Sequence, residues 1–260
     1  MPTAERDANT SASPVTVFMP AYNEAASITQ VLREFAETVV KPLNGRLLVC
    51  EDGSTDGTEK VLQQLSAELP MQLVTGRARK GYAGAMKDGL RQVNSDLVFF
   101  VDSDGQYDPV DFWKVWEARE SYDMVIGRKV RREEKFYRTL LSRSFHVLVK
   151  ALTTVPLEDM DCGFRLIRRA TVEQVLPEVG SLPHSFWAEF SIVAYRKGFR
   201  ILEVPISHRP SQRGVTSIYT WNKMPRIIMG QVTGLLRLSR RLNREDRTAR
   251  TRTVSVTSQT

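Results

Sequence analysis

The sequence LVFFVDSDGQ, residues 97–106, joins an apolar run to a turn that carries two carboxylates. Leu97–Val101 is short and rich in β-branched and aromatic residues, which is typical of a buried strand. Asp102 and Asp104 follow directly, so the strand brings two hard oxygen ligands to the edge of a sheet. Such ligands suit Mg²⁺ or Mn²⁺ held between the protein and a diphosphate. Because Asp and Gly are also common turn residues, this motif alone is equally consistent with a solvated turn.

Further runs of the same kind predict an α/β fold with a mostly parallel sheet. They are Val15–Met19, Arg46–Cys50, Gln72–Val74 and Met124–Ile126, separated by helix-length segments. Ligands of open α/β sheets gather at the carboxyl ends of the strands, so we expect the site just after these runs.

The alternation weakens after about Val130, where a second region begins. There we predict helices over 135–152 and 186–196, a strand over 199–204 and an amphipathic segment over 221–238. We expect a disordered N-terminus over 1–14 and one folded domain over 15–238, with halves at 15–130 and 131–238. The remaining 239–260 are predicted to be a disordered basic tail, because seven arginines fall between Arg237 and Arg252 without apolar periodicity.

The net charge of +7 suits a partner that carries phosphates: nucleic acid, an anionic membrane or a phosphorylated substrate. A noncatalytic nucleic-acid binder is disfavoured, because the basic residues concentrate after Val130 without interleaved aromatics and the acidic strand ends would repel a phosphate backbone. The longest apolar stretch, Ile227–Leu236, is about half of the roughly 20 residues of a spanning helix. We expect a cytoplasmic protein whose apolar segment near the basic tail either rests on the cytoplasmic membrane face or packs as an ordinary terminal helix.

Two more strand ends are acidic or polar. The first run ends in Pro20-Ala21-Tyr22-Asn23-Glu24, and the second in Glu51-Asp52-Gly53-Ser54-Thr55-Asp56-Gly57. Carboxylates at such places can accept hydrogen bonds from a ribose or a base, and Tyr22 offers a ring for stacking. Helix capping partly explains the presence of Ser54 and Asp56, but it does not explain why Glu51 and Asp52 both precede the glycine turn.

In this order and spacing the segments resemble glycosyltransferase family 2, and specifically its polyprenyl-phosphate branch of the dolichyl-phosphate mannose synthase type. The resemblance extends over roughly residues 15–214. Besides the three strand ends it includes Lys80–Ala85, Gly127-Arg128, Asp161–Arg165 and Gly198–Pro205.

The resemblance implies a GT-A fold, with the nucleotide-sugar half at 15–130 and the acceptor half at 131–238. It implies a UDP- or GDP-sugar donor, for which we assign Pro20, Tyr22, Asn23, Glu24, Glu51, Asp52, Lys80, Gly81, Asp102 and Ser103. It also implies that Mn²⁺ or Mg²⁺ lies among Asp102, Asp104 and Gln106 and bridges the diphosphate. A cation there would neutralise the leaving nucleoside diphosphate.

The acceptor depends on the arginines Arg128, Arg138, Arg143, Arg165, Arg209 and Arg213. Arg138 and Ser142 are four apart on a predicted helix, so they share a face and can hold one phosphate, although a solvated basic face is the alternative. Because family positions matching Arg128, Arg138, Ser142 and Arg213 bind phosphates, we assign the first three to the acceptor phosphate. The predicted catalytic residues are Asp104, Arg128 and Arg213. The family's Gly-x-Ser-Lys element lacks its lysine here, at 214–217.

A phosphate monoester is already ionised at neutral pH, so it needs cations for orientation but no general base. Many polysaccharide-extending members of the family carry a Glu-Asp pair near the acceptor helix, whereas Pro183–Phe190 offers only Glu189. We therefore expect an inverting transfer to a polyprenyl phosphate. The alternative is transfer to a hydroxyl of a saccharide, natural product or protein, with Glu189 or Asp161 as the base.

Overall fold

The computed structural model describes residues 14–76, 78–130, 148–182, 184–210 and 224–257, and within them one seven-stranded sheet runs in the order β3-β2-β1-β4-β6-β5-β7. Only β6 among these strands is antiparallel to its neighbours, β4 and β5. The other pairs are parallel, which confirms the predicted α/β class and mostly parallel sheet. The strands are β1 Val15–Ala21, β2 Arg46–Glu51, β3 Met71–Thr75, β4 Leu97–Val101, β5 Met124–Lys129, β6 Phe164–Arg168 and β7 Ile201–Ile206.

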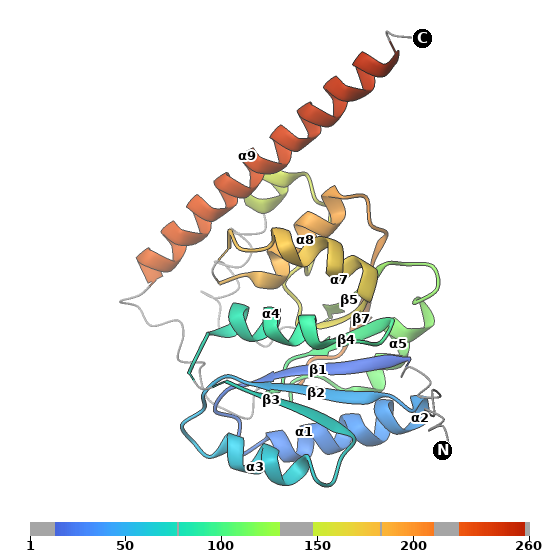
Figure 1. Cartoon of the computed structure of the whole chain (residues 1–260), viewed down its shortest axis with the longest axis vertical. Helices are drawn as coiled ribbons and strands as arrows, with labels where there is room; N and C mark the ends of the chain where they lie inside the picture. Colours follow the sequence, from blue (N-terminus) through green and yellow to red (C-terminus); the bar gives the residue numbers. More distant parts are fainter. Residues whose placement is uncertain (1–13, 77, 131–147, 183, 211–223, 258–260) are drawn as a thin grey trace, which may run out of the picture.

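Helices cover both faces of this sheet (Figure 1). They are α1 Ile28–Phe35, α2 Lys41–Leu43, α3 Thr58–Leu65, α4 Tyr82–Gln92, α5 Phe112–Glu117, α7 Arg169–Val175, α8 Phe186–Arg196 and α9 Met224–Thr257, with a π-helix η1 at Ala36–Val40 and 3-10 turns η2 at Pro109–Asp111 and η3 at Leu176–Glu178. Residues 148–153 are also helical, so the helix expected over 135–152 is described only in its last part.

Successive side chains of β4 point to opposite faces of the sheet, and each contacts the helices that cover its face. The Phe99 ring contacts Phe35 of α1 and Phe112 of α5, with ring centroids 6.1 and 4.9 Å apart. The next side chain, Phe100, lies 4.5 Å from the Trp187 ring of α8. Helix α4 also packs on the sheet: a Cβ added at Gly89 would lie 2.2 Å from the Phe18 ring of β1, so glycine permits this close approach.

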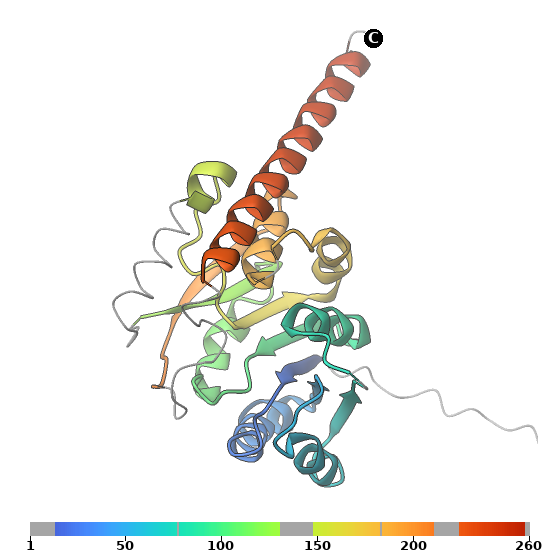
Figure 2. The same cartoon turned by 90° about the vertical axis from the view of Figure 1, so that its left-hand side faces the viewer.

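Helix α9 differs from the disordered tail that we expected over 239–260, because it continues as one helix to Thr257. Its buried side includes Leu235, Leu238 and Leu242, and the last of these lies beyond the predicted end of the domain at residue 238. The Ser239 hydroxyl also donates a hydrogen bond to the Leu152 carbonyl at 2.8 Å. Figures 1 and 2 show the last turns of α9 extending away from the sheet.

Candidate active site

The candidate site lies where three neighbouring parallel strands end. Strand β1 lies between β2 and β4 in the sheet, so the residues that follow these strands share one edge. The Asp52 N–H donates to the Ala21 carbonyl at 3.1 Å, which ties the second strand end to the first. The acidic segments expected to form the site therefore come together, as is usual for ligand sites of open α/β sheets.

Glu51 and Asp52, both buried, organise the loops at this edge. The Glu51 carboxylate accepts the Gly53 and Ser54 N–H groups. Asp52 accepts the N–H groups of Lys80 and Gly81 at 2.7 and 2.8 Å, and so fixes the turn that enters α4. In addition to the predicted contacts with a donor, the two carboxylates thus hold the loop backbone in place.

The segment after β1 is joined to the segment after β2 by Asn23 and Glu24. Asn23 adopts a positive φ of 56°, its N–H donates to Ser54 Oγ at 2.9 Å, and its Oδ1 accepts the Thr55 N–H at 2.8 Å. The Glu24 N–H donates to Thr58 Oγ1 at 2.8 Å. These hydrogen bonds join the loop after β1 to the loop after β2.

Tyr22 lies in the loop after β1 and Lys80 in the loop after β3, and each has a charged partner. The Arg79 guanidinium lies 3.9 Å from the centroid of the Tyr22 ring, a cation–π contact on one ring face. The Lys80 ammonium pairs with Asp88, which lies on α4. A nucleotide that stacked on Tyr22 would share the ring with Arg79.

Asp102 and Asp104 are held in one turn at the end of β4. The Tyr82 hydroxyl donates to Asp102 Oδ1 at 3.0 Å, and Asp104 accepts the Gln106 N–H at 3.0 Å. Between them, the Ser103 hydroxyl donates to the Pro20 carbonyl at 2.6 Å. Burial, together with the negative charge of Asp104, raises the pKa of Asp102 to about 7.

The chemistry of this turn fits a divalent cation. Two carboxylates that repel each other are stabilised by a positive charge between them. Among the residues that the structure describes, no group of three His, Cys, Asp or Glu side chains gathers as a metal site. Since Mg²⁺ commonly uses one or two carboxylates together with substrate phosphates and water, Asp102 and Asp104 would hold the cation jointly with a bound diphosphate.

Gln106, the third predicted metal ligand, connects this turn to the segment after β7. Its amide donates to the Arg209 carbonyl at 3.2 Å, and the Arg209 N–H donates to the Gln106 carbonyl at 2.7 Å. The Arg209 guanidinium lies 3.2 Å from Glu34 and 3.0 Å from Asp108. Gln106 and Arg209 therefore hold the rim of the site in place.

The predicted acceptor residues are described only in part. Arg128 is the residue before the last of β5, and its guanidinium lies 3.3 Å from Glu158 Oε2. Arg138, Ser142 and Arg213 lie outside the described residues. Arg165, which we grouped with the basic acceptor residues, is fully buried. It donates to the carbonyls of Met160 and Cys162, so its position supports the turn before β6 and not a phosphate.

The two carboxylates considered as general bases, Glu189 and Asp161, both accept backbone N–H groups, but Glu189 is buried whereas Asp161 is exposed. Glu189 is 0% exposed, and its carboxylate accepts the Ser181 and Leu182 N–H groups at 2.8 Å. Asp161 accepts the Ala188 N–H at 3.1 Å, and desolvation raises its pKa to about 6 in spite of the opposing charge of Arg165. Glu189 thus has the geometry of a residue that holds a loop.

Three residues at this site were not predicted as site residues. The Trp187 indole donates to the Tyr82 hydroxyl at 3.1 Å, and that hydroxyl donates to Asp102, so Trp187 is linked to Asp102 through Tyr82. A Cβ added at Gly163 would lie 1.7 Å from Asp102 Oδ2, so the carboxylate lies directly over this glycine. Tyr82 and Gly163 fall in segments of the family resemblance, whereas Trp187 lies between two of them, and the sequence does not show which partner each residue has.

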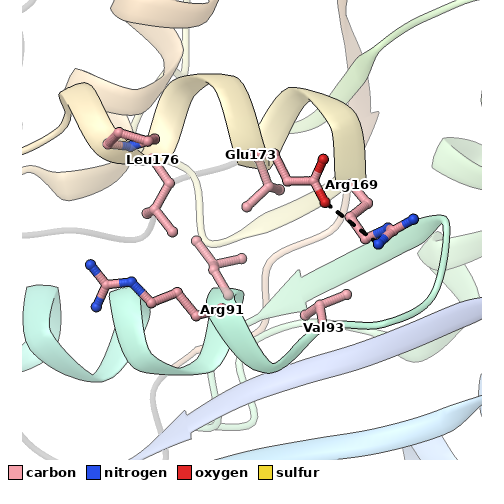
Figure 3. Close-up of a pocket in the computed structure, with 8 residues that line it drawn as sticks. Arg91, Val93, Arg169, Glu173 and Leu176 are labelled. Carbon is pink, nitrogen blue, oxygen red and sulfur yellow. Dashed lines mark ion pairs between the residues drawn. The ribbon is translucent and has the colours of Figure 1, made fainter.

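A cavity of about 330 Å³ lies away from this edge, between the last turn of α4 and α7 (Figure 3). Arg91 and Val93 line one side, and Arg169, Glu173 and Leu176 line the other. Arg169 forms an ion pair with Glu173 at 3.5 Å. Because Tyr82 begins α4 and Arg91 lies at its other end, this cavity is separate from the carboxylates of the candidate site.

The sheet, with its acidic strand ends, has the α/β architecture of the GT-A fold, and solved structures with this fold match the chain. Glucosyl-3-phosphoglycerate synthase from Mycobacterium tuberculosis, in complex with Mn²⁺, UDP and phosphoglyceric acid, matches with a TM-score of 0.65 and 17% identity, over 87% of this chain and 78% of that one. The mannosyltransferase PcManGT from Pyrobaculum calidifontis, in complex with GDP-Man and Mn²⁺, matches with a TM-score of 0.59 and 19% identity, over 92% and 76% of the two chains.

The chain belongs to glycosyl transferase family 2, whose model matches residues 16–176, and this confirms the resemblance seen in the sequence. Glycosyltransferase AglD from Haloferax volcanii is 30% identical in an alignment of 251 residues that covers 91% of this chain and 39% of AglD. Dolichol-phosphate mannosyltransferase from Pyrococcus furiosus is 26% identical, over 78% of this chain and 59% of its own. Undecaprenyl-phosphate 4-deoxy-4-formamido-L-arabinose transferase from Photorhabdus laumondii is 26% identical, over 85% and 67%. The chain thus spans about two fifths to two thirds of these relatives.

Proposed function

We propose that this glycosyltransferase moves a hexose, with inversion, from a UDP- or GDP-sugar to a polyprenyl phosphate, with Mn²⁺ or Mg²⁺ as cofactor. The observation that carries the proposal is the pair Asp102 and Asp104 at the end of β4, beside the strand ends that hold Glu51 and Asp52. Relatives named for dolichol phosphate and undecaprenyl phosphate support the acceptor. Solved structures that contain UDP or GDP-Man with Mn²⁺ support the donor and the cofactor.

The donor would lie over the strand ends. The nucleoside would be surrounded by Pro20, Tyr22, Asn23, Glu24, Glu51 and Asp52. The diphosphate would extend from there toward Asp102, past Lys80, Gly81 and Ser103. Asp102 and Asp104, with Gln106 beside them, would hold the cation, which supplies positive charge to the departing diphosphate. These groups are only partly exposed, which strengthens their electrostatic effect on the leaving group.

The acceptor phosphate would be held by Arg128 and by three residues outside the described ranges, Arg138, Ser142 and Arg213. A phosphate oxygen attacks the anomeric carbon opposite to the leaving group, a new carbon–oxygen bond forms, and the bond to the nucleoside diphosphate breaks. No proton has to be removed, because the acceptor is already an anion. This agrees with Glu189, whose oxygens accept backbone N–H groups and are not presented to an acceptor.

A lipid acceptor would require the enzyme to approach a bilayer. None of the described helices is both long and apolar enough to cross one. Helix α9 carries exposed apolar side chains, Ile228, Met229 and Leu236, on a helix that also exposes Arg237 and Arg240. Basic amphipathic helices of this kind bind anionic lipid surfaces, so we assign α9 to contact with the cytoplasmic membrane face.

The test measures release of nucleoside diphosphate from a panel of UDP- and GDP-sugars, with Mn²⁺ or Mg²⁺, in the presence and absence of a short polyprenyl phosphate. We expect release to require the metal and the lipid phosphate, and to disappear in Asp104→Asn. The matched control is Asp96→Asn. Asp96 precedes β4, at the end of the strand opposite to Asp104, is largely exposed and forms an ion pair with Arg169. Release without lipid phosphate would move the acceptor to a hydroxyl, and no release at all would contradict the proposal.

A further inference from the structure

The Tyr82 hydroxyl lies between an indole and the Asp102 carboxylate. It accepts a hydrogen bond from Trp187 Nε1 at 3.1 Å and donates one to Asp102 Oδ1 at 3.0 Å. Because the indole N–H can only donate, the hydroxyl is left to donate its proton toward Asp102. The three groups therefore form a directed chain that ends on a predicted metal ligand.

Trp187 is firmly packed, whereas the Tyr82 side chain is 45% exposed and its hydroxyl is held by the two hydrogen bonds. Trp187 is 1% exposed, and its ring lies 4.5 Å from Phe100 and 4.2 Å from the Arg165 guanidinium. Tyr82 is the first residue of α4, and the turn before it is fixed by the Asp52 carboxylate. The hydroxyl is thus held from α8 on one side and from the β2 strand end on the other.

The opposite side of the Asp102 carboxylate is closed by backbone. Oδ2 lies over Gly163, where an added Cβ would be only 1.7 Å away, and the Asp102 N–H donates to the Gly163 carbonyl at 3.1 Å. With Tyr82 at Oδ1 and Gly163 beside Oδ2, the carboxylate has little freedom to rotate. Such rigid support of a ligand usually tunes both the orientation of the ligand and the affinity for the metal.

We infer that Tyr82, held by Trp187, is a positioning residue that orients the Asp102 carboxylate toward a divalent cation bound with a nucleoside diphosphate. It acts through Asp102 and links α8, in the acceptor half, to the cation in the donor half. The inference rests on the proposed function, because it requires a cation at Asp102.

The test is Tyr82→Phe, which removes one hydroxyl and keeps the ring. The matched control is Tyr195→Phe, since Tyr195 lies on α8, is 37% exposed and is not part of the chain. Mn²⁺ affinity is measured by electron paramagnetic resonance with saturating UDP and, separately, GDP. We expect Tyr82→Phe to weaken Mn²⁺ binding about tenfold, because a hydrogen bond to a charged group is lost, and the control to leave it unchanged.

Two further measurements separate positioning from general damage. In ¹⁵N-labelled protein the indole resonance of Trp187 should shift in Tyr82→Phe and stay in place in Tyr195→Phe. Binding of the nucleotide in excess chelator should be the same in wild type and in both variants, because the chain ends on the metal ligand.

Equal Mn²⁺ affinity of wild type and Tyr82→Phe would overturn the inference and leave the proposed function intact. An equal loss of metal-free nucleotide binding would also overturn it, since Tyr82 would then support the fold of the pocket. If wild type binds no Mn²⁺ with either nucleotide, the proposed function fails and the inference fails with it.

Discussion

Glu189 and Asp102 differ in the hydrogen-bond donors that surround their carboxylates. The buried Glu189 accepts backbone N–H groups from Ser181 and Leu182, so its charge is compensated within the protein. Asp102 accepts a single tyrosine hydroxyl and lies near Asp104, and its pKa is raised by burial and by that neighbouring charge. The first carboxylate needs no ligand, whereas the second would be stabilised by a cation. This contrast distinguishes structural acids from candidate metal ligands.

Gly163 is expected to be intolerant of any side chain. A methyl group there would overlap Asp102 Oδ2, so we expect Gly163→Ala to lower the free energy of unfolding by about 1–3 kcal/mol and to abolish metal-dependent transfer. Urea denaturation and a transfer assay measure the two effects. Gly180→Ala is the control, because its added Cβ would meet only the Lys87 ammonium, at 3.6 Å. An active, fully stable Gly163→Ala variant would contradict this geometry.

Glu189→Gln separates a structural role from a catalytic one. Its amide group would present N–H donors to the backbone N–H groups of Ser181 or Leu182, so we expect a loss of about 1–3 kcal/mol in unfolding free energy. At temperatures where the variant is folded, kcat should stay close to that of wild type. A folded variant without activity would instead favour a hydroxyl acceptor with Glu189 as the base.

Asp161 predicts a specific pH dependence of stability. Its pKa is raised by desolvation from 3.8 to about 6, so the folded state keeps the proton to a higher pH than the unfolded chain. Its contribution to the free energy of unfolding is complete below pH 3.8 and is lost as the pH rises to about 6, and solvent screening of this exposed side chain makes the change smaller than the shift alone implies. Urea denaturation of wild type and Asp161→Asn across this range should show the variant gaining relative stability with pH. Parallel profiles would exclude this role of Asp161.

At the scale of elements, most of the sheet follows from short apolar runs. Leu97–Val101 was predicted with its observed bounds, and the other predicted strands differ from the observed ones by one to three residues at an end. Strand β6, Phe164–Arg168, was not predicted. Two arginines interrupt its apolar pattern, and one of them, Arg165, is buried by carbonyl acceptors that only the folded chain brings together.

The candidate site was predictable where it depends on strand ends and not where it depends on packing. Acids that directly follow β2 and β4 had to reach one edge of the sheet, because parallel neighbours end on the same side. The contact of Tyr82 with Asp102 spans 20 residues of sequence, and its contact with Trp187 spans 105. No local pattern encodes such pairs.

Helix α9 is the element predicted to contact the membrane. We expect the double change Arg237→Glu and Arg240→Glu to reduce binding to vesicles of anionic phosphatidylglycerol at least about tenfold, because each basic residue near such a surface contributes about 1 kcal/mol. Sedimentation with vesicles measures the effect. The control carries Lys41→Glu and Lys60→Glu, which make the same charge change on exposed residues of α2 and α3. An equal reduction in both double variants would refute a specific role of α9.

At the scale of the whole molecule, one sheet joins the two halves of the reaction. Strand β4, which is followed directly by Asp102, pairs with β6, and β6 pairs with β5, which includes Arg128. The residues proposed to bind the donor and the acceptor are therefore fixed on one continuous sheet. Such a scaffold can hold the attacking phosphate and the anomeric carbon in reacting geometry, a major source of rate acceleration.

The most direct test of this proposal is the structure of the product. The full chain is incubated with Mn²⁺, the UDP- or GDP-sugar that it uses and a short polyprenyl phosphate, and the lipid fraction is analysed by mass spectrometry and ³¹P NMR. We expect one hexose joined to the lipid through a phosphodiester, and no product from the corresponding polyprenol. A sugar attached to a hydroxyl, or donor consumption with no change in the lipid phosphate, would contradict transfer to a lipid phosphate.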